Sequence, residues 1–119
     1  IRFCPDDFIV VSGDDFTSMP TVFIGSKGVI SVVSNVDPGG MARVMEAALD
    51  GNAETAKKEH YRLFPLMKLM FMSPSPAAPK KALELIGRMK DSSPRLPMMP
   101  ADEPTTQALK DELARLGMI

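Results

Sequence analysis

Two short apolar runs near the start of the chain predict buried β-strands. Residues 8–11 and 29–33 are rich in β-branched side chains, are continuous rather than alternating, and are bounded by Asp, Gly and Asn. Such runs are typical of strands that are covered on both faces of a sheet. Between them, Asp14 or Asp15 can cap a short helix over residues 16–24. The pattern therefore predicts one β-α-β unit with two parallel strands.

The rest of the chain has the periodicity of amphipathic helices. Asp37 can begin the first of them, and Asn52 can cap the second. Pro65 removes a backbone donor from the second helix, so we expect a kink or a new segment there. Helices are predicted over residues 38–50, 52–71, 78–87 and 105–116. The predicted element order is β-α-β-α followed by three further helices.

The predicted strand pair is not self-sufficient. Parallel strands that are covered on both faces need neighbours in the same sheet, and the sequence predicts none. An isolated pair leaves both edges unpaired and its faces exposed. We therefore expect either that copies of the chain assemble as a homo-oligomer or that the chain is part of a larger α/β fold.

Charge and composition exclude several classes of partner. The 14 basic and 15 acidic residues give a formal net charge of -1, so no strong field favours nucleic acid or an anionic membrane. No apolar run reaches the roughly 18 residues that span a bilayer. The single cysteine, Cys4, excludes an internal disulfide and a cysteine-based metal site. These features fit a cytoplasmic protein.

The residues that follow the predicted strands are the candidates for chemistry. In a (β/α)₈ barrel, active-site residues lie at the carboxyl ends of the strands, which selects residues 12–15 and 34–35. Gly13 either lets a small ligand approach the backbone or serves only the strand-to-helix turn. Asp14 and Asp15 are most simply helix cap and dipole partners, with acid, base or ligand-anchoring roles as the alternative.

Two other candidates are weaker. A class I aldolase needs a desolvated lysine as its nucleophile, but Lys27 precedes its strand and is predicted to be a solvated turn residue. His60 is predicted on a solvent-facing helix beside Lys57, Lys58 and Glu59, without partner ligands for a metal. The ten methionines are expected to fill the core. No metal site and no catalytic residue follow from these positions.

Taken in order, the motifs of the chain resemble those of the dihydrodipicolinate synthase family over essentially its whole length. They are Ser-Gly-Asp-Asp at 12–15, Gly-x-x-Gly-Val-Ile-Ser-Val at 25–32, Asn-Val at 35–36, Ala-Leu-Asp-Gly at 48–51, Leu-Phe-Pro-Leu at 63–66, Ser-Pro-Ser-Pro at 73–76, Arg-Leu-Pro at 95–97 and Leu-Ala-Arg-Leu-Gly at 113–117. The resemblance implies the C-terminal portion of such an enzyme. Residues 1–51 would form the last two β/α units of a TIM (β/α)₈ barrel, and residues 52–119 a C-terminal helical domain, within a homotetramer.

The resemblance also implies an activity and roles for four residues. The family is a class I lyase of lysine and diaminopimelate biosynthesis, without a cofactor, that condenses pyruvate, held as a Schiff base on a barrel lysine, with aspartate semialdehyde. Gly13 looks like the glycine at the mouth of the keto-acid pocket, and Ile30 like the isoleucine beside the Schiff base. Asp14 and Asp15 look like rim acids that face the aldehyde.

The groups that perform the family's chemistry have no match in this sequence. The Schiff-base lysine, the tyrosine and threonine proton relay and the carboxylate-binding arginine lie on earlier strands and loops of the family, so the chain alone is expected to be inactive. A related keto-acid aldolase, such as an N-acetylneuraminate lyase-like enzyme, is an alternative. A truncated, non-catalytic paralogue is another.

Overall fold

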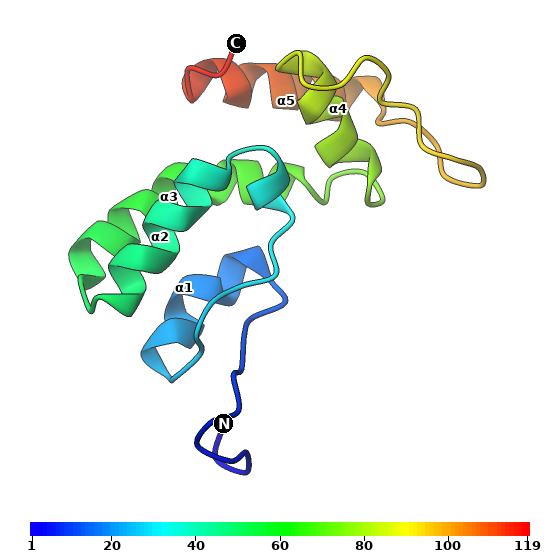
Figure 1. Ribbon diagram of the computed structural model, residues 1–119. Coiled ribbons are helices and arrows are strands. Elements are labelled where there is room, and N and C mark those ends of the chain that lie inside the picture. The colour runs from blue at the N-terminus through cyan, green and yellow to red at the C-terminus, as the bar shows by residue number, and fades with distance from the viewer. The chain divides into compact units, whose positions relative to one another are not determined.

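The computed structural model describes residues 1–119, which form two compact units, residues 1–64 and 65–119. The helices are α1 (Asp15–Phe23), the 3₁₀ turn η1 (Val33–Asn35), α2 (Pro38–Leu49), α3 (Ala53–Leu69), α4 (Ala77–Leu85) and α5 (Glu103–Arg115), as Figure 1 shows. All five predicted α-helices are confirmed to within about two residues at each end, the uncertainty usual for helix termini. The units divide inside α3, whereas the sequence-based division falls between residues 51 and 52. None of the helices is long and apolar enough to cross a bilayer.

The two predicted strands meet in a single parallel bridge rather than a sheet. The bridge pairs Ser12 with Val29. The Ser12 amide donates to the Gly28 carbonyl, and the Ile30 amide donates to the Ser12 carbonyl, each over 2.8 Å. The parallel direction of the pair is therefore as predicted.

The prediction of two extended strands covered on both faces is wrong for these residues. Phe8 and Ile9 are 62% and 70% exposed. The second run also ends early, because Val33 already belongs to η1. A parallel ladder is stabilised by neighbouring strands, and two strands without further partners are marginal. The structure is mostly helical, and the barrel units implied by the resemblance are not formed by these residues alone.

Short polar side chains begin four of the helices. In each case an Asp or Asn accepts the backbone N–H three residues later, which satisfies one of the free donors of the first turn. The pairs are Asp14 with Thr17, Asp37 with Gly40, Asn52 with Thr55 and Asp102 with Thr105, at 2.8–3.1 Å. The predicted starts at Asp14, Asp37 and Asn52 are confirmed.

In the first unit, α2 buries the apolar face that its periodicity predicts. The buried residues are Met41, Val44, Met45 and Ala48. The Phe16 ring of α1 packs edge-on against Phe64 of α3, with ring centroids 5.6 Å apart. The His60 ring lies at the same centroid distance from Phe64. These contacts join α1 and the first part of α3 through an aromatic cluster.

The prediction that His60 faces solvent is wrong. Its side chain is 5% exposed, and Nδ1 is buried without a hydrogen-bond partner. Lys57 and Lys58 are exposed, but His60 follows the buried Ala56 by four residues and so shares its face of α3. Burial lowers the pKa of His60, because the imidazolium loses hydration.

A polar clamp holds α2 beside α3. The Arg62 guanidinium pairs with Asp37 at 3.2 Å and with Glu59 at 3.0 Å. A Cβ on Gly40 would collide with the side chains of Asp37 and Arg62. Glycine at this position therefore allows the close approach of the two helices.

The second unit has a mainly apolar centre made by the end of α3, α4 and α5. Its buried apolar side chains include Leu66, Met67, Met70, Ala77, Ala78, Ala82, Leu109 and Leu113. The predicted role of the methionines as core filler is confirmed for Met67 and Met70. The helix α3 continues through Pro65, so no new segment starts there. A bond of 3.0 Å between the hydroxyls of Ser73 and Thr105 joins the loop after α3 to the start of α5.

Candidate functional site

The parallel bridge brings the two predicted site segments together. Gly13 directly follows the bridged Ser12, and Ile30 directly follows the bridged Val29. Because the segments run in the same direction, their carboxyl ends lie at the same edge. The structure thus places Gly13 and Ile30 on neighbouring chain segments. Residues 34–35, which the sequence predicted to follow the second strand, lie in η1.

The surroundings of Gly13 distinguish between its two interpretations. Its φ is not in the left-handed region, so the turn does not require glycine. A Cβ built on Gly13 meets no atom within 4 Å, so packing within these residues does not require glycine either. The backbone is open at this point, and the approach of a small ligand to it stays a prediction. The Ile30 side chain is 73% exposed and is free to line such an approach.

Asp14 and Asp15 are adjacent in sequence but have different surroundings. The Asp14 carboxylate accepts the N–H of Thr17 at 3.0 Å and its hydroxyl at 2.7 Å, which confirms the predicted helix cap. The Asp15 side chain is 1% exposed. Its Oδ2 accepts the backbone N–H groups of Val32 and Val33, each at 3.0 Å. The aldehyde-facing role of the two acids stays a prediction.

Sequence reasoning missed the contact between Asp15 and the second segment. The partners are 17 and 18 residues away, and no local spacing rule relates positions so far apart. The only available signal was the choice of a small acid in the first helical turn, which a helix dipole explains equally well.

The strand ends carry no nucleophile with an adjacent base. Lys27 is exposed and precedes the bridge, with its amide donating to the Val10 carbonyl at 2.8 Å. This is the solvated turn position that the sequence predicts. No group of three or more His, Cys, Asp or Glu residues is placed to hold a metal ion. The arrangement can form a pocket wall, and it offers no reactive group.

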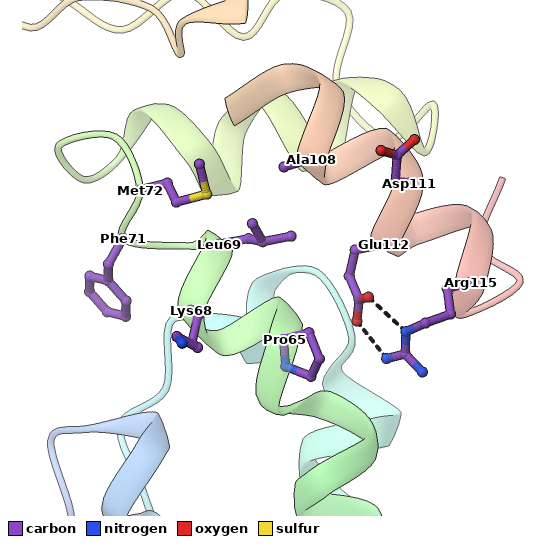
Figure 2. Close-up of a pocket in the computed structure, with 9 residues that line it drawn as sticks. All are labelled: Pro65, Lys68, Leu69, Phe71, Met72, Ala108, Asp111, Glu112 and Arg115. Atoms are coloured by element: carbon purple, nitrogen blue, oxygen red, sulfur yellow. Dashed lines mark hydrogen bonds and ion pairs between the residues drawn. The ribbon is translucent and has the colours of Figure 1, made fainter. Parts of the chain in front are cut away.

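A groove of about 610 Å³ lies in the second unit and is shown in Figure 2. It is lined by Pro65, Lys68, Leu69, Phe71, Met72, Ala108, Asp111, Glu112 and Arg115. The Glu112 carboxylate accepts from Nε and Nη2 of Arg115 at 2.7 and 2.6 Å, and this bond raises the pKa of Arg115. The groove is mainly apolar, and its most buried charged side chain, Glu112, is paired with Arg115. None of its lining residues belongs to residues 12–15 or 34–35.

Comparison with known proteins matches the chain to one family along nearly all its length. The sequence model of the Dihydrodipicolinate synthetase family matches residues 1–116. A 4-hydroxy-tetrahydrodipicolinate synthase of Desulfotalea psychrophila is 54% identical over 119 residues, which are 100% of this chain and 40% of that protein. One of Archaeoglobus fulgidus is 44% identical over 119 residues, which are 41% of its length. The chain therefore spans about 40% of the curated relatives it matches.

Solved structures agree with this match. A dihydrodipicolinate synthase of Thermotoga maritima superposes with a TM-score of 0.91 at 39% identity, covering 95% of this chain and 38% of that one. A chloride-inhibited enzyme of Acinetobacter baumannii, solved in complex with pyruvate, superposes with a TM-score of 0.89 at 31% identity, covering 94% and 38%.

Proposed function

Because this chain belongs to the dihydrodipicolinate synthetase family, we propose that residues 1–119 are the C-terminal part of a 4-hydroxy-tetrahydrodipicolinate synthase. This lyase condenses pyruvate with aspartate semialdehyde in lysine biosynthesis. The observation that carries the proposal is the parallel bridge that places Gly13 beside Ile30, since these are the two residues that the family resemblance assigns to the keto-acid pocket.

In this proposal the chain supplies walls of the pocket rather than its reactive groups. Gly13 admits pyruvate close to the backbone, and Ile30 covers one side of the reacting carbon with an apolar surface. Such a surface excludes water from the Schiff base, which water would otherwise hydrolyse. Asp14 stands at the rim toward the aldehyde, whereas the Asp15 carboxylate is buried against the amides of Val32 and Val33.

The nucleophilic lysine is proposed to lie outside residues 1–119. Its amine adds to the keto carbon of pyruvate, and water leaves as the Schiff base forms. Loss of a methyl proton then gives an enamine, which attacks the aldehyde carbon of the second substrate. Lys27 lies on the wrong side of the bridge for this task, and the other lysines of the chain follow Gly51, on helices or in the loop after α4.

The exposed apolar residues of the first unit support a larger assembly. Phe3, Phe8, Ile9 and Ile24 are exposed, which is unusual for residues of this size and favours cover by further strands. We propose that the remaining barrel strands cover these residues and that the whole enzyme is a homotetramer.

Borohydride trapping tests the proposed function. The full-length protein that contains these residues is incubated with pyruvate, reduced, digested and analysed by mass spectrometry. One pyruvate adduct is expected, on a lysine outside residues 1–119, and the isolated 119-residue chain should take up none. An adduct on Lys27, or none on the full-length protein, would contradict the proposal. Adding aspartate semialdehyde or N-acetylmannosamine before reduction identifies the aldehyde that consumes the enamine.

A further inference from the structure

The carboxylate of Asp15 joins two loops that are far apart in the sequence. Its Oδ2 accepts the N–H groups of Val32 and Val33 at 3.0 Å each, while Oδ1 is buried without a hydrogen-bond partner. Hydrogen bonds from amides to an ionised carboxylate are stronger than neutral ones, and burial removes water as a competitor. The contact is therefore a firm link between the first turn of α1 and the start of η1.

The parallel bridge supplies a second link on the other side of the same loops. There the Ser12 carbonyl accepts the Ile30 N–H at 2.8 Å. Between the two links lie only residues 13–14 on one segment and residue 31 on the other. Loops of one or two residues that are held at both ends have few accessible conformations. The two links together therefore determine the separation of Gly13 and Ile30.

We propose that Asp15 is a positioning residue that sets this separation, and with it the width of the keto-acid pocket. The inference rests on the proposed function, which makes Gly13 and Ile30 the pocket walls. Asp15 acts through the backbone of Val32 and Val33, because its carboxylate is buried against their amides. A displacement of about 1 Å in a positioned group can cost about a hundredfold in rate, so a lost link has a measurable effect.

Three substitutions of Asp15 in the full-length protein separate geometry from charge. Asp15→Asn keeps an acceptor oxygen in place without the charge, Asp15→Glu keeps the charge but displaces it, and Asp15→Ala removes both. We expect Asp15→Ala and Asp15→Glu to raise the KM for pyruvate about tenfold or more, and Asp15→Asn by about threefold or less. Hydrogen exchange at the Val32 and Val33 amides should accelerate in Asp15→Ala and Asp15→Glu and stay slow in Asp15→Asn.

Asp37→Ala is the matched control for loss of stability alone. Asp37 is also a carboxylate at a helix start, and its side chain accepts the Gly40 N–H at 2.8 Å and pairs with Arg62. Its only contact with the site segments is the backbone bond from its N–H to the Val33 carbonyl, which the alanine substitution leaves in place. Both alanine variants should lower Tm, whereas only Asp15→Ala should change the KM for pyruvate and the exchange at Val32 and Val33.

An unchanged KM or retained protection of both amides in Asp15→Ala overturns the proposal. If Asp15→Ala does not fold, the remaining pair decides, and equal KM values for Asp15→Asn and Asp15→Glu overturn it. A wild-type protein that forms no pyruvate adduct refutes the proposed function and the pocket role together. Exchange at Val32 and Val33 then still reports separately whether the link exists.

Discussion

The helical core of residues 65–119 is held by apolar burial, whereas the two non-helical segments of residues 1–64 that carry the candidate site are joined by polar links. Leu109 and Leu113 of α5 are fully buried in the second unit, and Val44 and Leu63 are equally buried between the helices of the first. The bridge at Ser12 and the buried Asp15 connect the site segments, and Ile30 remains exposed there. The difference indicates that the helices satisfy their own cores, while the site segments present surface for further strands and for a ligand.

The largest expected effect is the loss of a core side chain in the second unit. Leu109→Ala should lower the free energy of unfolding of the chain by about 2–5 kcal/mol, because it leaves a cavity among buried helices. Ile30→Ala in the first unit should change it by about 0.5 kcal/mol or less, since that side chain is already in water. Urea unfolding followed by circular dichroism measures both. A comparable loss from Ile30→Ala would break the comparison.

Neighbouring glycines at the start of α2 provide the next test. Gly40→Ala should destabilise the chain by about 1–3 kcal/mol, because its Cβ collides with the Asp37 and Arg62 pair. The Cβ of Gly39→Ala makes ordinary contacts with the end of Arg43 at 3.5 Å and with Asp37 Oδ1 at 3.9 Å. This substitution should stabilise α2 by up to about 1 kcal/mol through helix propensity. Thermal unfolding of the two variants should therefore shift in opposite directions. Equal shifts would show that the clamp between α2 and α3 is not needed.

Gly13→Ala should separate function from stability in the first unit. The new Cβ meets no atom within 4 Å, so the Tm of the chain should be unchanged. In the full-length protein the same methyl group enters the proposed pocket, and the KM for pyruvate should rise about tenfold, or about 1.4 kcal/mol in binding free energy. A fall in Tm without a change in KM would show instead that Gly13 serves the turn.

The smallest effect concerns pH and the one histidine. Burial lowers the pKa of His60 in the folded chain. In the unfolded chain the pKa of this histidine has its ordinary value of about 6.5, so the unfolded chain binds the proton more readily. Stability should therefore be full above that pH and fall as the pH decreases toward about 5. Urea unfolding at pH 7.5 and at pH 5 measures the loss, and His60→Phe should reduce it. The second unit contains no histidine, so the protection factors of the α5 amides, which are corrected for the intrinsic pH dependence of hydrogen exchange, should show no such change. An equal loss of stability between pH 7.5 and pH 5 in His60→Phe would show that groups other than His60 cause it.

Local features of the fold were predictable because they depend on neighbours in sequence. A helix cap needs only an acceptor and an amide three residues later, so Asp37 and Asn52 were identified correctly, and the first cap was narrowed to Asp14 or Asp15, of which Asp14 is the cap. The extent of the strands was not predictable in this way, because a strand is stabilised by partners that need not be close in sequence. The burial of His60 was missed for the same reason, since the aromatic cluster around Phe64 includes a ring from α1.

The sequence by itself predicted the helices, the caps at Asp37 and Asn52, and the parallel direction of the first two segments. Its ordered motifs also indicated the family. Only the tertiary structure decided that Asp15 faces the amides of Val32 and Val33 while Asp14 remains a cap. The reason is physical: periodicity and capping act over three or four residues, but a buried carboxylate binds whatever donors the fold brings to it. The site wall formed by Gly13 and Ile30 depends on both levels, since the motif selects the residues and the bridge places them side by side.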